Sequence, residues 1–226
     1  MKAFIIFRDR VTYAKRCASA LRLAGLDVHV IDNGTTWPPA MAWLDVLEAR
    51  GTPVMRKGGG HPQEIWGWPP FRETVGDERY VVTDPDVVPD AACPLDWPAR
   101  LEKILDEPDG YTKVGLGLRI DDIPASYHHR DHVTEWERQF WANPIRDGSM
   151  YAAQVDTTLA MYERLPEQPY FTIDGIRTGP PYLANHLAWY EDLGNLTAEL
   201  QYYHEHTEPG ISFWTLEDRS AWNTTA

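Results

Sequence analysis

Short apolar runs alternate with segments of helical spacing through the first 83 residues, and this alternation restricts the chain to few folds. Ala3–Phe7 is a continuous apolar run, which is typical of a buried parallel strand. Further strands are predicted at Asp27–Ile31, Thr52–Met55 and Tyr80–Thr83. Strands separated by helices predict an α/β fold, with a mostly parallel central sheet flanked by helices.

The helices between these strands have recognisable signals. Thr12 is predicted to cap the first helix, and Gly25 stands where its C-terminal end belongs. Pro39–Arg50 predicts the second helix, and a short helix is expected at Pro62–Trp66. Ten tryptophans are many for 226 residues, and Trp66 and Trp68, amid glycines and prolines, are expected to be the most exposed of them.

Polar residues follow each of these strands directly. Arg8-Asp9-Arg10 follows the first strand, Asp32-Asn33 the second, Lys57 the third, and Asp84-Pro85-Asp86 the fourth. Ligands of open parallel sheets bind beyond the carboxyl ends of the strands. The sequence therefore predicts a ligand site at this edge, where Lys57 could reach a phosphate or a base.

Asp84 and Asp86 are the strongest candidates for chemistry. Two residues apart at a strand end, their side chains point the same way. Carboxylate oxygens suit Mg²⁺ or Mn²⁺, and such a cation neutralises a diphosphate. The spacing alone is also typical of a solvated turn with Pro85 at its corner, so its position after the fourth strand carries the argument.

The rest of the chain has weaker signals. Helices are predicted at Trp97–Leu105, Val133–Trp141, Tyr182–Tyr190 and Leu196–His204. A strand is predicted at Tyr111–Ile120, and Tyr151–Tyr162 is a strand-like run that Asp156-Thr157-Thr158 interrupts. No internal repeat and no clear boundary is present, so residues 1–226 are expected to form one domain.

Composition excludes some classes of protein. The net charge of −13 disfavours nucleic acid as the default partner, and it suits a divalent cation. Cys17 and Cys93 match neither a disulfide framework nor a zinc site, which favours reduced thiols and a cytoplasmic protein. The apolar N-terminal run is too short for a signal peptide or a membrane span.

The sequence resembles glycosyltransferases of the GT-A fold, in the broad neighbourhood of glycosyltransferase family 2. The likeness covers about the first 90 residues, through Phe7-Arg8-Asp9-Arg10, Asp32-Asn33-Gly34-Thr35-Thr36 and Thr83-Asp84-Pro85-Asp86-Val87-Val88-Pro89. It implies a nucleotide-sugar substrate whose nucleotide is held by the first two loops, with Arg8 and Asp32 at a uridine-like moiety. It also implies that Asp84 contacts the ribose or metal and that Asp86 is a metal ligand.

The acceptor side is assigned to residues 111–226 and the donor side to residues 1–110. Asp156 is the first candidate for a general base toward an acceptor hydroxyl, and Asp122 the second. The usual acidic catalytic motif of the family is not cleanly present. Many GT-A enzymes complete the metal site with a C-terminal histidine; of His186, His204 and His206, we favour His206. Ser212 and Trp214 resemble a closing tail that donates to the diphosphate.

The sequence thus predicts a metal-dependent glycosyltransferase with a donor that is UDP-linked. Its acceptor is a glycan, a small metabolite, a protein or a modified DNA base. A nucleotidyltransferase of related fold is a second interpretation, although no glycine-rich loop follows the first strand. A non-catalytic module that binds nucleotide-sugars is a third.

Overall fold

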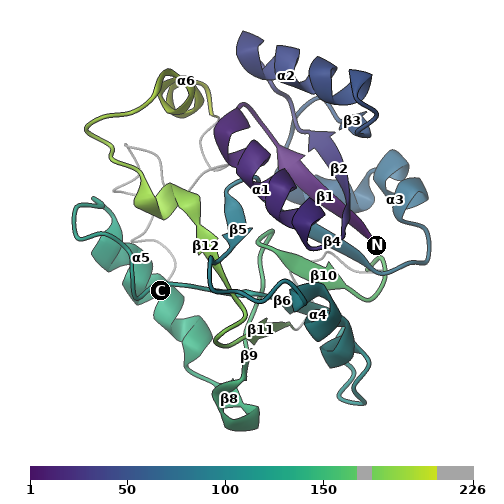
Figure 1. The fold of residues 1–226 in the computed structure, drawn as a ribbon, viewed down its shortest axis with the longest axis vertical. Coiled ribbons are helices and arrows are strands. Elements are labelled where there is room, and N and C mark those ends of the chain that lie inside the picture. Colours follow the sequence, from purple (N-terminus) through teal and green to yellow (C-terminus); the bar gives the residue numbers. More distant parts are fainter. Residues whose placement is uncertain (167–174, 208–226) are drawn as a thin grey trace.

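The computed structural model describes residues 1–166 and 175–207 as a mixed α/β molecule (Figure 1). The α-helices are α1 (Val11–Leu23), α2 (Pro38–Ala49), α3 (Pro69–Val75), α4 (Trp97–Leu105), α5 (Arg130–Arg138) and α6 (Ala198–His206). The strands are β1 (Lys2–Phe7), β2 (Asp27–Asp32), β3 (Val54–Arg56), β4 (Tyr80–Thr83), β5 (Val87–Pro89), β6 (Lys113–Gly115), β7 (Gly117–Leu118), β8 (Pro144–Ile145), β9 (Met150–Ala152), β10 (Ala160–Tyr162), β11 (Ile176–Thr178) and β12 (Leu183–His186).

The large sheet has the strand order β3-β2-β1-β4-β10-β6-β11-β9-β8. The first four strands are parallel neighbours, which confirms the prediction for the first part of the chain. Only β10 and β9 run against the other described strands of this sheet. A smaller sheet, β5-β12-β7, stands beside the carboxyl ends of β1 and β4. The predicted fold class, α/β with a mostly parallel central sheet, is therefore confirmed.

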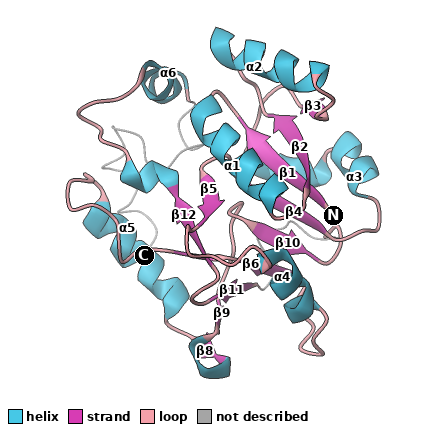
Figure 2. Ribbon diagram, in the orientation of Figure 1, coloured by secondary structure: helices cyan, strands magenta, loops and turns pink. Residues whose placement is uncertain are grey.

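Helices cover both faces of the large sheet (Figure 2). On one face, Cys17 of α1 and Leu101 of α4 pack against odd-numbered residues of β1 such as Ile5. On the other face, Phe71 of α3 packs against Phe4. Alternate residues of β1 thus enter different clusters, as a strand buried on both faces requires.

Two predictions for the second half of the chain are wrong at least in part, and a third agrees with the structure. The expected strand Tyr111–Ile120 is divided between β6 and β7, which belong to different sheets. The predicted interruption of Tyr151–Tyr162 is present: an irregular segment that contains Asp156, Thr157 and Thr158 separates β9 from β10. Of the expected helix Tyr182–Tyr190, the first part is strand β12, and only Leu187–Tyr190 is helical, as a 3₁₀ helix.

Two smaller expectations in the first half are also wrong. Thr12 does not cap α1, which begins at Val11 after Arg10; instead, the Thr12 backbone N–H and hydroxyl donate to the carboxylate of Glu199. Trp66 is buried, and its indole N–H donates to the Tyr80 hydroxyl at 3.0 Å. Pro62–Gly67 is a 3₁₀ helix, in agreement with the short helix expected there.

The contact of Glu199 with Thr12 places α6 beside the first turn of α1. A carboxylate at a helix N-terminus satisfies a backbone donor and interacts favourably with the helix dipole. A second contact joins the same regions, because the Tyr13 hydroxyl donates to Glu191 at 2.9 Å. The C-terminal helix therefore lies next to the carboxyl end of β1 (Figure 1).

No helix among residues 1–166 and 175–207 is both long enough and apolar enough to cross a membrane.

Candidate active site

An open pocket of about 200 Å³ lies at the carboxyl ends of β1, β2 and β4. The first half of the chain contributes charged and polar side chains to it, among them Arg8, Arg10, Asn33, Asp84 and Asp86. The second half contributes Asp156, Thr157, Thr158, His186 and Tyr203. The predicted ligand edge therefore contains a pocket, and both halves of the chain line it.

Asp84 is fixed by the segment that precedes β10. Its Oδ2 accepts a hydrogen bond from the Thr157 hydroxyl at 2.5 Å, and its backbone N–H donates to the Thr157 carbonyl at 3.0 Å. Burial and the neighbouring charge of Asp86 hold the pKa of Asp84 well above its usual range. Two carboxylates this close disfavour the double negative charge, and a cation between them would relieve the repulsion.

Asp86 has a different environment. Its Oδ2 accepts from Arg10 Nη1 at 2.6 Å and lies 3.7 Å from His186 Nε2. Burial opposes its charge, but Arg10 and His186 outweigh burial, so the pKa of Asp86 lies below its usual value. Its Oδ1 is buried and accepts no hydrogen bond from another residue that the structure describes. Asp86 therefore keeps one oxygen available for a ligand.

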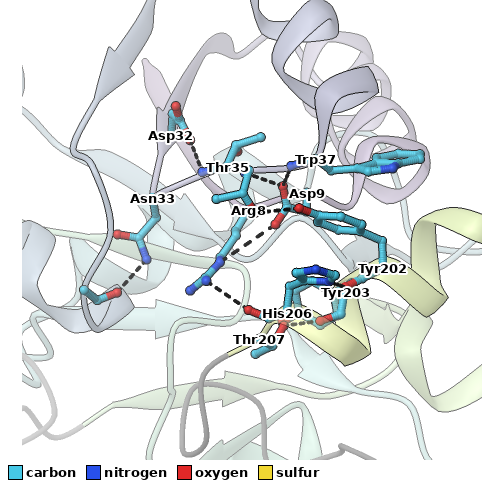
Figure 3. A network of polar contacts seen from close by, with 12 residues as sticks. Arg8, Asp9, Asp32, Asn33, Thr35, Trp37, Tyr202, Tyr203, His206 and Thr207 are labelled. Atoms are coloured by element: carbon cyan, nitrogen blue, oxygen red, sulfur yellow. Dashed lines mark hydrogen bonds and ion pairs between the residues drawn. The ribbon is translucent and has the colours of Figure 1, made fainter.

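Arg8 and Asn33 line the pocket, and Lys57 lies beside Asn33. Arg8 Nη2 donates to the carbonyl of His206 at 3.3 Å, which joins the loop after β1 to α6 (Figure 3). The Asn33 amide donates to the carbonyl of Gly60 at 2.9 Å. Lys57 Nζ lies 3.3 Å from Asn33 Oδ1 and 2.9 Å from Glu64 Oε2, and does not line the pocket.

Asp9 and Asp32 support the loops instead of lining the pocket. Asp9 adopts a positive φ of 58°, and its Oδ1 accepts from the backbone N–H groups of Thr36 and Trp37 at 2.8 Å each. Asp32 accepts from the Thr35 N–H at 2.8 Å and pairs with Arg56 at 3.3 Å. These bonds fix the loop between β2 and α2, part of which Figure 3 shows.

Phe7 also lies outside the pocket, because its ring is fully buried and packs on Trp43 at 4.9 Å between centroids. Its carbonyl accepts from the Asn33 N–H at 2.8 Å. Of the residues predicted to bind the nucleotide, some therefore line the pocket and others hold the loops in place.

The two candidate general bases lie in different places. Asp156 lines the pocket and is exposed, and its Oδ1 accepts from the Thr157 N–H at 2.8 Å. Asp122 is not among the pocket residues; it accepts from the Tyr190 hydroxyl at 2.5 Å and lies 3.4 Å from Arg119. The structure therefore places only Asp156 near the candidate metal ligands.

Among the three candidate histidines, the structure brings His186 to Asp86. The ring of His206 stacks on Tyr202 at 3.8 Å, and its Nδ1 lies 2.9 Å from the Tyr202 carbonyl. His204 Nε2 lies 3.2 Å from Glu191. Ser212 and Trp214 lie outside the described residues.

Several pocket residues were missed by the sequence interpretation. Among them are Thr157 and Thr158, which follow Asp156, and Tyr203 of α6. The two adjacent hydroxyls of Thr157 and Thr158 could have indicated a polar site in the sequence. Nothing in the sequence places Tyr203 beside the loop after β1. Thr158 Oγ1 is buried without a hydrogen-bond partner in the described part of the chain.

The residues present fit a divalent cation that shares its coordination with a ligand. Within the described ranges, no group of three His, Cys, Asp or Glu side chains could hold an ion by itself. Mg²⁺ is usually bound by one or two carboxylates together with substrate phosphates. Asp84 and Asp86, with the free Oδ1 of Asp86, match that arrangement.

No family model matches this chain, and no curated protein matches its sequence. Solved structures do match. A mannosyltransferase from Pyrobaculum calidifontis in complex with GDP-Man and Mn²⁺ is 15% identical and has a TM-score of 0.50. The match covers 83% of this chain and 56% of the mannosyltransferase, so the chain spans little more than half of that protein.

Two further matches have lower TM-scores. S. aureus TarS 1–349 is 10% identical, with a TM-score of 0.49 over 83% of this chain and 61% of that chain. A UTP-bound UGPase from Acinetobacter baumannii is 13% identical, with a TM-score of 0.47 over 94% of this chain and 97% of that chain. At these identities the likeness concerns the fold. The chain has the GT-A glycosyltransferase fold.

Proposed function

We propose that this protein transfers a sugar from a nucleotide-sugar donor, in the first instance UDP-linked, to an acceptor hydroxyl. One observation carries the proposal: Asp84 and Asp86 share a pocket with Arg8 and Asn33 at the carboxyl edge of a GT-A sheet. The mannosyltransferase of the same fold, which was solved with GDP-Man and Mn²⁺, supports it. The acceptor stays open among glycans, small metabolites, proteins and modified DNA bases.

Asp84 and Asp86 would hold Mn²⁺ or Mg²⁺, with His186 as the candidate histidine. When bound, the cation would stabilise the negative charge that develops on the departing nucleoside diphosphate. Arg8 is a second source of positive charge in the pocket, and guanidinium groups suit phosphate oxygens. Asn33 and the loop that it contacts at Gly60 would lie along the nucleotide.

Transfer requires a base for the acceptor. The acceptor oxygen attacks the anomeric carbon while the bond from that carbon to the diphosphate breaks. Asp156 would accept the hydroxyl proton, and the nucleoside diphosphate would leave. A single displacement of this kind inverts the anomeric configuration. Asp156 suits the role because it is exposed within the pocket that also contains Asp84.

The test is a panel of UDP- and GDP-sugars incubated with the protein and Mn²⁺, with the released nucleoside diphosphate as readout. We expect release with at least one donor, and a loss of about 100-fold or more in Asp84→Asn. Asp131→Asn is the control, because Asp131 lies outside this pocket and its side chain is exposed.

Three results would contradict the proposal, and each points elsewhere. Pyrophosphate released from UTP and a sugar 1-phosphate would indicate a nucleotidyltransferase. Donor binding without any release would indicate a binding module. No binding of any donor, measured by calorimetry with Mn²⁺ present, would remove the nucleotide-sugar site altogether.

A further inference from the structure

Arg10 already occupies the position beside the aspartate that the proposed function assigns to a cation. Its Nη1 lies 2.6 Å from Asp86 Oδ2, and the two side chains are 11% and 2% exposed. A pair so well buried interacts more strongly than a surface ion pair, since solvent screens it less. Arg10 is therefore the counter-ion of Asp86 in this structure.

Arg10 is also held by the C-terminal helix. Its guanidinium lies over the ring of Tyr203 at 4.3 Å from the centroid, and 5.8 Å from the ring of Tyr13. A cation over an aromatic face is stabilised, more so when it is desolvated. Arg10 thus connects the loop after β1, the end of β4 and α6.

The guanidinium has donor capacity that this arrangement leaves unused. A guanidinium carries five N–H donors, and Arg10 Nε is buried with no hydrogen-bond partner among residues 1–166 and 175–207. The same side chain lines the pocket. Phosphate oxygens are the acceptors that a planar guanidinium fits best. Arg10 can therefore take a phosphate without leaving the pocket.

Binding of a divalent cation without a nucleotide would be disfavoured at this site. The cation would compete with Arg10 for Asp86 Oδ2 and would place a second positive group beside the guanidinium. A diphosphate removes both problems, because its oxygens can accept from Arg10 and also coordinate the cation.

We propose that Arg10 couples cation binding to nucleotide binding: it pairs with Asp86 in the free protein and turns to the diphosphate when the donor binds. Asp86 then offers both carboxylate oxygens to the cation. This inference rests on the proposed function, since it uses the same diphosphate and the same two aspartates. It assigns a positioning role to a residue that the sequence placed only in the nucleotide loop.

The experiment is a titration with Mn²⁺ followed by electron paramagnetic resonance, with and without UDP or GDP, in which no turnover is measured. For the unaltered protein, we expect weak binding of Mn²⁺ alone and an increase in affinity on the order of tenfold when the nucleotide is present. In Arg10→Gln, we expect Mn²⁺ alone to bind about tenfold more tightly, because a buried positive neighbour is removed. The nucleotide should then add little.

Arg22→Gln is the matched control, since Arg22 is an exposed arginine of α1 whose partner is Thr52. It should behave like the unaltered protein. Thermal unfolding shows whether each variant is folded. If Arg10→Gln does not fold, Tyr203→Leu takes its place: without the ring, the guanidinium is held less firmly, and Mn²⁺ alone should bind about threefold more tightly.

The outcomes separate this inference from the proposed function. Unchanged or weaker Mn²⁺ binding in Arg10→Gln, or in Tyr203→Leu if that variant is needed, would overturn the coupling role of Arg10. Nucleotide binding that Mn²⁺ does not affect in the unaltered protein would overturn it as well. The proposed function fails on a different result, namely that no nucleotide or nucleotide-sugar binds with or without Mn²⁺.

Discussion

Two regions of the chain contribute to one pocket, but they reach it in different ways. The first region consists of the loops after β1, β2 and β4, and the second consists of the segments beyond β6. The strands of the first region are parallel neighbours, so the residues that follow them meet at one edge. In the second region, an expected strand is divided between two sheets, and the segment before β10 is irregular. Asp156 and His186 reach the pocket from there, whereas Asp122 does not.

The difference shows when the end of a strand determines where a polar side chain lies. In a parallel sheet the position of a polar side chain follows from the strand before it, and adjacent strands give adjacent side chains. In the second region β10 runs antiparallel to β4, so Thr157 meets Asp84 from the start of a strand. Position along the chain then says little about position in the pocket.

The largest effect on the rate is expected for Asp86, a charged residue that the first region contributes to the pocket. Asp86→Asn keeps the shape of the side chain but removes the charge that pairs with Arg10. Release of nucleoside diphosphate should fall about 10³-fold, because a bound cation contributes several kcal/mol to such a step. Asp32→Asn is the comparison, since Asp32 also follows a strand but does not line the pocket.

Asp32→Asn should change the rate less than about tenfold, because an amide oxygen can still accept from Thr35. Both rates are measured with the same donor and Mn²⁺. Equal losses of rate in Asp86→Asn and Asp32→Asn would mean that an aspartate at a strand end matters for the reaction whether or not it lines the pocket.

In the second region, the sharper test is Asp156→Asn beside Asp122→Asn. If Asp156 accepts the acceptor proton, its substitution should lower the transfer rate by about 100-fold or more. Asp122→Asn should leave the rate near that of the unaltered protein. The measurement is transfer to an acceptor at saturating donor, and a loss in Asp122→Asn alone would reverse the assignment.

Much of the first region could be predicted from sequence because its strands are buried on both faces. Such strands form continuous apolar runs, and Tyr80–Thr83 was predicted with the bounds that the structure has. The roles of the polar residues after each strand could not be predicted. Asp9 and Asp32 look like ligand residues in sequence, but their carboxylates accept backbone N–H groups of the next loop.

The second region could be predicted less well because long-range contacts decide its structure. The run Tyr182–Tyr190 has helical spacing, but β12 pairs with β5 and β7 and so becomes a strand. Gly117 of β7 also depends on a long-range contact, because a Cβ there would collide with the Thr178 carbonyl. His186 reaches Asp86 only because that strand pairing places it there.

Lys113 of β6 gives the protein a pH dependence of stability. Its side chain is 1% exposed, and burial lowers its pKa from 10.5 to about 8. The unfolded chain therefore binds more protons than the folded chain between these values, so stability rises with pH across this range. From pH 7.5 to 9.5 the free energy of unfolding should gain about 2 kcal/mol.

Lys113→Met lacks the titrating group, so its free energy of unfolding should not show this gain. The difference between the unaltered protein and Lys113→Met gives the contribution of Lys113 separately from that of other groups. Urea denaturation at the two pH values measures it. The same increase in both proteins would show that another group causes the pH dependence.

The smallest expected effect concerns how the loops of the first region are held together. Gly34 has a φ of 87°, and a Cβ there would lie 2.8 Å from the Cα of Gly59, which belongs to the loop after β3. Gly51 has a similar φ of 80°, but nothing lies within 4 Å of its Cβ position. Gly34→Ala and Gly51→Ala thus share the backbone strain, on the order of 1 kcal/mol, and differ in the collision.

We expect Gly51→Ala to lower stability by about that strain alone and to leave nucleotide binding unchanged. Gly34→Ala should lower stability further and weaken nucleotide binding by about threefold, because Asn33 and the Gly60 carbonyl that it contacts must separate. Urea denaturation and calorimetric titration with UDP measure the two effects. Nucleotide binding that is equal in both variants would mean that the close approach of these two loops serves stability and not the pocket.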